Sequence, residues 1–177
     1  MTAIGKQLRS PDGGSVTLMD QGVDREGEYL IVEHRINRRG ALNGPHLHPV
    51  LAESFTVKDG KMRFVVDGEE RWLGPGETIA IKPYQVHQFW NESDNGLLAI
   101  HEIRPPGRHW KMFELIHKLE TEGKMNKNGI PRNPLWLAVA WECIDGYIAG
   151  PPRWAQTVFL GGLAKLAGAL GYRINDL

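Results

Sequence analysis

The hydrophobic and polar positions of this chain follow two periods, one typical of strands and one of helices. From Tyr29 to Ile103, short apolar-rich runs are separated by Gly, Pro, Asn and Asp, with no helical interlude between them. These runs predict strands at Tyr29–Ile36, Glu53–Val57, Lys61–Val66, Thr78–Ile81, His87–Trp90 and Leu97–Ile103. Short strands at such close spacing indicate an antiparallel sandwich or barrel.

The residues between the strands are those that tight turns require. Asp59-Gly60 and Asp67-Gly68 lie between predicted strands, and the glycine of each pair supplies the positive φ of a hairpin turn. Gly74-Pro75-Gly76 marks a further break. The sequence therefore predicts hairpin connections within a sheet.

After Pro105-Pro106-Gly107 the apolar positions take a helical period. Three runs are predicted as helices: Trp110–Leu119, Leu135–Ile148 and Trp154–Leu170. We therefore predict a mainly β protein with a β domain at residues 1–106, whose barrel spans about 29–105, and a helical extension at 107–177.

Composition and charge exclude some kinds of partner. Basic and acidic side chains number 21 each, without a basic cluster, so a nucleic-acid partner is not expected. The single cysteine, Cys143, cannot form an internal disulfide, which fits a reducing compartment. The first residues lack the apolar core of a secretory signal. We expect a cytoplasmic protein.

One group of residues has the spacing of a metal site. His46 and His48 are two residues apart, so in an extended chain both imidazoles point to the same face. Glu53 begins the next predicted strand, and His87 adds a third imidazole from a distant strand. Three imidazoles and one carboxylate suit one divalent transition metal: Fe, Mn, Ni, Zn or Cu.

Together with the glycines around them, these residues resemble the two motifs of the cupin superfamily. The first motif matches from Gly40 through the ligands to Gly60, and the second matches in the spacing of Gly76, His87 and Asn91. The resemblance covers roughly residues 29–105. It implies a small antiparallel jelly-roll barrel with a metal at its centre, held by His46, His48, Glu53 and His87.

The second motif departs from the family pattern at two places. Pro83 stands one position late, and Tyr84 or Gln85 stands where the family usually has glycine. The departure concerns the geometry of the local turn and not the ligand His87.

Three further side chains are candidates for a substrate pocket: His34, Tyr84 and His101. His34 alternates with Leu30, Val32 and Ile36 on the more apolar face of its predicted strand, and His101 has the same place on the strand Leu97–Ile103. This places both imidazoles inside the barrel. For both histidines we favour a structural role over contact with a substrate.

The run Trp154–Tyr172 carries one charge, Lys165, and is about long enough to cross a bilayer. Because Lys165 lies in its middle and the preceding runs are also apolar, we favour a buried or oligomer-forming helix over a membrane contact. The apolar surface of three helical runs is large for a small monomer. We therefore expect a homodimer.

The resemblance indicates the kind of site and not the reaction, because one fold supports many chemistries. Our first hypothesis is a metal-dependent enzyme that binds a small organic molecule. We prefer a dioxygenase acting on an aromatic or enol-like substrate, with an isomerase or lyase as the next choice. Glu53 is the candidate catalytic residue, as both ligand and proton acceptor. The alternative is a non-catalytic binding or sensor module on the same barrel.

Overall fold

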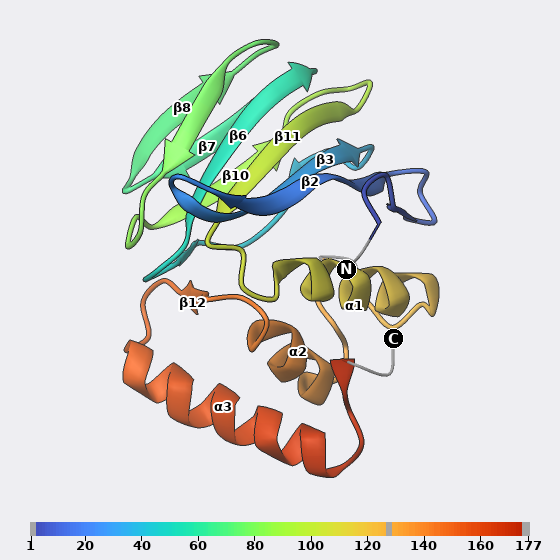
Figure 1. The fold of residues 1–177 in the computed structure, drawn as a ribbon, viewed down its shortest axis with the longest axis vertical. Coiled ribbons are helices and arrows are strands. Elements are labelled where there is room, and N and C mark those ends of the chain that lie inside the picture. The colour runs from blue at the N-terminus through green and yellow to red at the C-terminus, as the bar shows by residue number, and fades with distance from the viewer. Residues whose placement is uncertain (1–2, 127–128, 175–177) are drawn as a thin grey trace.

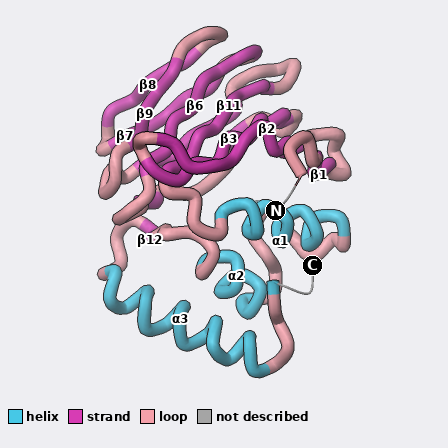
Figure 2. The backbone as a smooth tube through the Cα atoms, viewed as in Figure 1, coloured by secondary structure: helices cyan, strands magenta, loops and turns pink. Residues whose placement is uncertain are grey.

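A computed structural model describes residues 3–126 and 129–174. It contains two antiparallel sheets that lie face to face, with three helices gathered at one end of them (Figure 1). Apart from the short strand β12, which lies next to α2 and α3, the strands and helices occupy separate parts of the molecule (Figure 2). This arrangement confirms the predicted antiparallel jelly-roll fold followed by C-terminal helices.

The first sheet has six strands and carries the longest ones. Its spatial order is β1 (Gln7–Arg9), β2 (Ser15–Asp24), β3 (Gly27–Ile36), β11 (Leu97–Arg104), β6 (Ala52–Asp59) and β9 (Thr78–Ile81). Inward-facing residues alternate with outward-facing ones along β11, where every second residue from Leu97 is buried.

The second sheet has shorter strands and includes one from the C-terminal part of the chain. Its order is β12 (Tyr147–Ile148), β5 (His46–Leu47), β10 (His87–Asn91), β7 (Met62–Val66) and β8 (Glu69–Leu73), and β4 (Gly40–Ala41) also pairs with β10.

All six predicted strands are present, within a few residues of their predicted ends. The sequence did not indicate β2, because only Ser15 and Leu18 of its ten residues are buried and its apolar alternation is weak. The second helical prediction, Leu135–Ile148, was wrong at its C-terminal end. Helix α2 spans Pro134–Trp141, and the chain then turns through Gly146 into β12.

The other two helices agree with the periodic pattern. Helix α1 (His109–Thr121) and helix α3 (Arg153–Ala169) cover the predicted runs. Helix α1 joins two cores: Trp110 packs with the β-sheet residues Leu30 and Ile103, and Leu115 packs with the helical tail. No helix in the described part of the chain is long and apolar enough to cross a membrane.

Helix α3 leaves an apolar stripe in solvent. Its buried residues are Gln156, Ala164 and Ala167. The stripe comprises the exposed side chains of Trp154, Val158, Phe159, Leu166 and Leu170. Exposed large apolar side chains at this density are uncommon on a soluble monomer and typical of a binding face.

We propose that two copies of the chain pack through this stripe as a two-fold dimer. Light scattering should then give a mass of about 40 kDa, twice the 19.9 kDa of one chain. Val158→Glu should shift the mass to that of one chain, because a carboxylate would be buried in the interface. Val23→Glu, at an equally exposed valine of β2, is the matched control and should leave the dimer intact. A wild-type mass near 20 kDa would contradict the proposal.

Candidate metal centre

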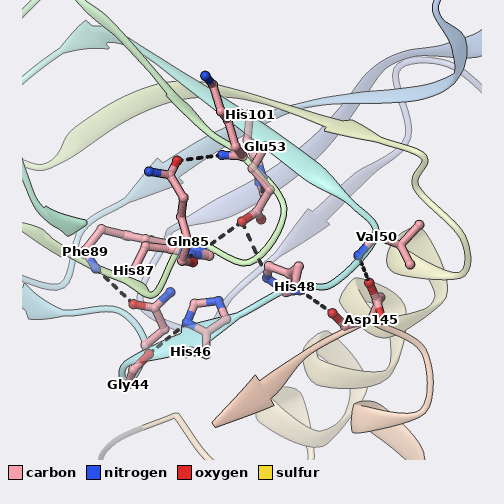
Figure 3. A network of polar contacts seen from close by, with 12 residues as sticks. Gly44, His46, His48, Val50, Glu53, Gln85, His87, Phe89, His101 and Asp145 are labelled. Atoms are coloured by element: carbon pink, nitrogen blue, oxygen red, sulfur yellow. Dashed lines mark hydrogen bonds and ion pairs between the residues drawn. The ribbon is translucent and has the colours of Figure 1, made fainter. Parts of the chain in front are cut away.

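The four predicted metal ligands come together between the two sheets (Figure 3). Strand β5 carries His46, His48 follows it directly, and β6 of the opposite sheet carries Glu53. His87 begins β10 and is the direct cross-strand partner of His46. The short β5–β10 pairing therefore aligns two imidazoles, and the facing sheet adds the carboxylate.

The distances between the ligand atoms suit one ion. One ligand atom from each of the four residues lies within 4.8 Å of the other three. The Oε2 of Glu53 lies 2.9 Å from the Nε2 of His87 and 3.5 Å from the Nε2 of His48. Two ligands each about 2.1 Å from one ion and at right angles to each other are about 3.0 Å apart. The observed separations are close to this value.

Backbone carbonyls fix the orientation of all three imidazoles. In each ring Nδ1 lies at hydrogen-bond distance from a carbonyl oxygen: 2.8 Å from Gly44 for His46, 2.8 Å from Asp145 for His48 and 3.0 Å from Gln85 for His87. Because a carbonyl can only accept, each Nδ1 carries the proton and each Nε2 has a free lone pair. This is the arrangement of metal-ligating histidines.

Buried polar atoms without a hydrogen bond show that the residues fit a cation. Among the described residues, the Nε2 atoms of His48 and His87 and the Oε2 of Glu53 are buried and lack a hydrogen-bond partner. With the proton on Nδ1, these nitrogens present lone pairs to a carboxylate, which is repulsive. A divalent ion between them would satisfy all three atoms at once.

The protonation states also suit a metal. Burial lowers the pKa of His46 to about 4, with further contributions from His87 and His48, and burial is also the main cause of the lowered pKa of His48. Burial alone would raise the pKa of Glu53, but the hydrogen bond from His101 opposes it, and the pKa is held well below the usual range. At neutral pH, His46 and His48 are therefore neutral and Glu53 is charged, as metal binding requires.

Residues 32–101, which contain all four ligands, match the family described as Cupin domain. The match covers residues 32–101 of the 177 and identifies this segment as a cupin domain. No curated protein matches the sequence.

Several solved cupin structures resemble the barrel. KdgF from Halomonas sp. is 18% identical, with a TM-score of 0.47, over 55% of this chain and 84% of its own. A sugar phosphate isomerase of the cupin superfamily from Silicibacter pomeroyi is 21% identical, with a TM-score of 0.42, over 52% of this chain and 59% of its own. Streptomyces PAC13 is 13% identical, with a TM-score of 0.43, over 56% of this chain and 75% of its own. No activity follows from likeness at these values.

Two further histidines of the cupin barrel extend the network beyond the ligands. The Nε2 of His101 lies 3.0 Å from the Oε1 of Glu53, and its Nδ1 lies 3.2 Å from the Nε2 of His34. The His101 ring also stacks on Phe55, with centroids 4.0 Å apart. As predicted, both histidines lie on the inner face. His101 holds one oxygen of Glu53 and thereby turns the other toward the ligands, and a role in substrate binding stays a prediction.

His109, in the first turn of α1, lies near this network and was not predicted from the sequence. It is buried, its ring lies 6.2 Å from that of His101, and its Nδ1 has no hydrogen-bond partner. Burial lowers the pKa of His109 to about 3 and that of His34 to about 3. A histidine in a helix outside both motifs gives no sequence signal of this place.

Tyr84 is mostly exposed, at 57%, and its ring lies under the guanidinium of Arg153, 5.1 Å from the ring centroid. Its φ is +68°, in the left-handed region where glycine is favoured. This explains the departure noted in the second motif, since Tyr84 adopts the backbone conformation of the glycine that is usual there. Its N–H donates to the carbonyl of His48 at 2.8 Å, which ties the turn to a ligand. Its contact with a substrate stays a prediction.

Removal of one ligand should separate metal binding from folding. His48→Ala should weaken binding of Zn²⁺ or Co²⁺ by at least about 100-fold, because an imidazole ligand is lost, while the β-sheet circular dichroism is retained. His117→Ala, at a histidine of α1 outside the four ligands, is the control and should bind as the wild type does. Full metal occupancy in His48→Ala, measured by equilibrium dialysis, would show that the ligand assignment is wrong.

The metal-free protein should lose stability in mild acid. The pKa of His34 and that of His109 are lowered by burial to about 3, whereas in the unfolded chain they stay near about 6.5. Below about pH 6.5 the unfolded chain binds protons that the folded protein does not, so the free energy of unfolding falls as the pH falls toward 3. The urea concentrations at the midpoint of unfolding, compared at pH 7 and pH 5, measure this loss of stability. His34→Phe or His109→Phe should reduce it, and equal wild-type midpoints would contradict it.

Proposed function

We propose that this cupin is a metal-dependent enzyme, with a dioxygenase acting on a small aromatic or enol-like molecule as the preferred activity. The observation that carries the proposal is the buried Oε2 of Glu53, which faces the unprotonated nitrogens of His48 and His87. A purely structural core would leave these polar atoms unsatisfied at a cost of several kcal/mol. Cavities with this donor set hold iron, manganese, nickel, copper or zinc.

Each residue of the site would have a separate role. His46, His48, His87 and Glu53 would hold the ion, which when bound supplies Lewis-acid chemistry and, if it is iron, electron transfer to dioxygen. His101 holds Oε1 of Glu53 and keeps the carboxylate oriented. The low-dielectric interior strengthens every charge interaction at the site.

The charge of the site supports an anionic substrate oxygen. If the imidazoles are neutral, the Glu53 carboxylate would cancel one of the two positive charges of a divalent ion. The site would then carry one net positive charge. An enolate or phenolate oxygen would neutralise that charge within a dry interior. His46 is the ligand that is partly exposed, whereas the other three are buried, so a substrate would reach the ion on the His46 side.

An isomerase or lyase is the second candidate, since the same ion would stabilise an enolate. Such a reaction needs a proton acceptor next to the substrate. Glu53 remains our candidate for this role, but its Oε1 is engaged by His101 and its pKa is held well below the usual range. A carboxylate in this state is a weak base, and this favours the dioxygenase over the isomerase or lyase. The alternative to an enzyme is a non-catalytic protein that binds or senses a small molecule.

We also propose that the protein works in a reducing compartment such as the cytoplasm. Cys143 is free and buried, and its thiol donates to the carbonyl of Val139 in α2. Burial raises the pKa of this thiol, so it is protonated and suited to packing rather than to redox chemistry.

Protein purified without chelator and without added metal should contain about one equivalent of iron per chain by elemental analysis. An oxygen electrode should then record uptake with at least one member of a panel of catechols and enolised diketones. His87→Ala should lose both the metal and the uptake, because it removes a ligand and nothing else from the site. Zinc or manganese without oxygen uptake would favour the isomerase or lyase. Metal-free protein that also fails to bind added Fe²⁺, Mn²⁺ or Zn²⁺ would contradict the metal-dependent proposal.

A further inference from the structure

The C-terminal tail touches the metal centre at several places. Asp145 lies beside His48 (Figure 3), and β12, which follows it, pairs with β5, the strand that carries His46. In β12, Tyr147 pairs with Leu47 and Ile148 pairs with His46 itself. The Ala149 N–H extends the pairing by donating to the carbonyl of Pro45 at 3.0 Å. Strand β5 therefore lies between β10 of the barrel and β12 of the tail.

Asp145 acts on the second ligand through both its backbone and its side chain. Its carbonyl accepts from the Nδ1 of His48 at 2.8 Å, which sets the tautomer of that ring. Its carboxylate accepts from the N–H of Val50, in the turn that follows His48. Gly146 lies against the same ring: a Cβ there would be at van der Waals distance, 3.4 Å, from the Cε1 of His48. Of the four ligands, His46 and His48 are thus held in part by the tail.

Helix α3 is fastened to this segment by one buried side chain. Gln156 donates to the carbonyls of Ile148 and Pro151 and accepts from the N–H of Ile148, each at 2.9 Å. A buried amide with three backbone partners fixes the position of β12 relative to α3. Through β12 the position of α3 is linked to the strand of His46, although Gln156 has no hydrogen bond to a ligand.

We propose that the C-terminal tail is a working part of the metal centre, so that docking of residues 142–157 and binding of the divalent ion stabilise each other. The inference rests on the proposed metal-binding function and assigns Asp145 and Gln156 as positioning residues. The coupling is reciprocal: a docked tail orients His46 and His48 for the ion, and the ion in turn holds the strand on which the tail docks.

The test combines metal affinity with hydrogen exchange of the full-length protein. Zn²⁺ affinity is measured by competition with a chromophoric chelator, and the visible spectrum of the Co²⁺ form reports the coordination geometry. Gln156→Ala should bind roughly 10-fold more weakly and alter the Co²⁺ spectrum, because it releases the support behind two ligands. Gln7→Ala is the matched control, since it also removes a glutamine's hydrogen bonds, but at the far β1–β2 edge. It should leave both readouts unchanged.

Hydrogen exchange of the wild type is the second measurement, and it holds even if Gln156→Ala does not fold. Adding Zn²⁺ should slow exchange of residues 142–157 as well as of the ligand strands β5 and β10. Protection of β5 and β10 alone, or unchanged affinity in a folded Gln156→Ala, would overturn the inference and leave the proposed function standing. Wild-type protein that binds no metal would overturn both.

Discussion

Burial of the Glu53 carboxylate is the constraint on which the rest of this structure depends. Removing a carboxylate from water costs several kcal/mol unless partners compensate for it. His101 compensates at Oε1, but Oε2 meets only the unprotonated nitrogens of His48 and His87. These donor atoms fit a divalent cation, which would compensate the charge at Oε2. The polar part of the interior is therefore arranged around this one carboxylate.

The positions of the four candidate ligands mean that an ion bound between them would link the two sheets. Glu53 lies on β6 of the first sheet, whereas His46 and His87 lie on β5 and β10 of the second. Apolar packing, such as that of Phe55 against Phe64, holds the same two sheets together away from the site. Hydrophobic burial can therefore stabilise the fold without an ion, and a bound ion would act on the ligands alone. This separation is typical of a site added to a stable scaffold.

The ligands could be predicted from the sequence because their chemistry lies in side chains at a regular spacing. His46 and His48 share a face at a period of two, and the alternation of β11 correctly placed His101 inside the barrel. Asp145 could not be predicted, since its contact with His48 is made by a backbone carbonyl that any residue could supply. The helix predicted after Pro134 was too long for a similar reason. The chain leaves the helix to pair with β5, and no local periodicity in the sequence indicates that tertiary contact.

Pairing with the C-terminal tail makes β5 an inner strand of its sheet. Without β12, the two-residue strand β5 would be an edge strand, with one row of its backbone N–H and C=O groups unpaired beside the candidate ligands. Pairing with β12 encloses β5, and the carbonyl of Asp145 fixes the ring of His48 from the same side. His46 has its Nδ1 bound to Gly44 and remains partly exposed. The tail therefore covers the His48 side of the centre, where His48 is buried. We infer that ions and small molecules would reach the centre on the His46 side.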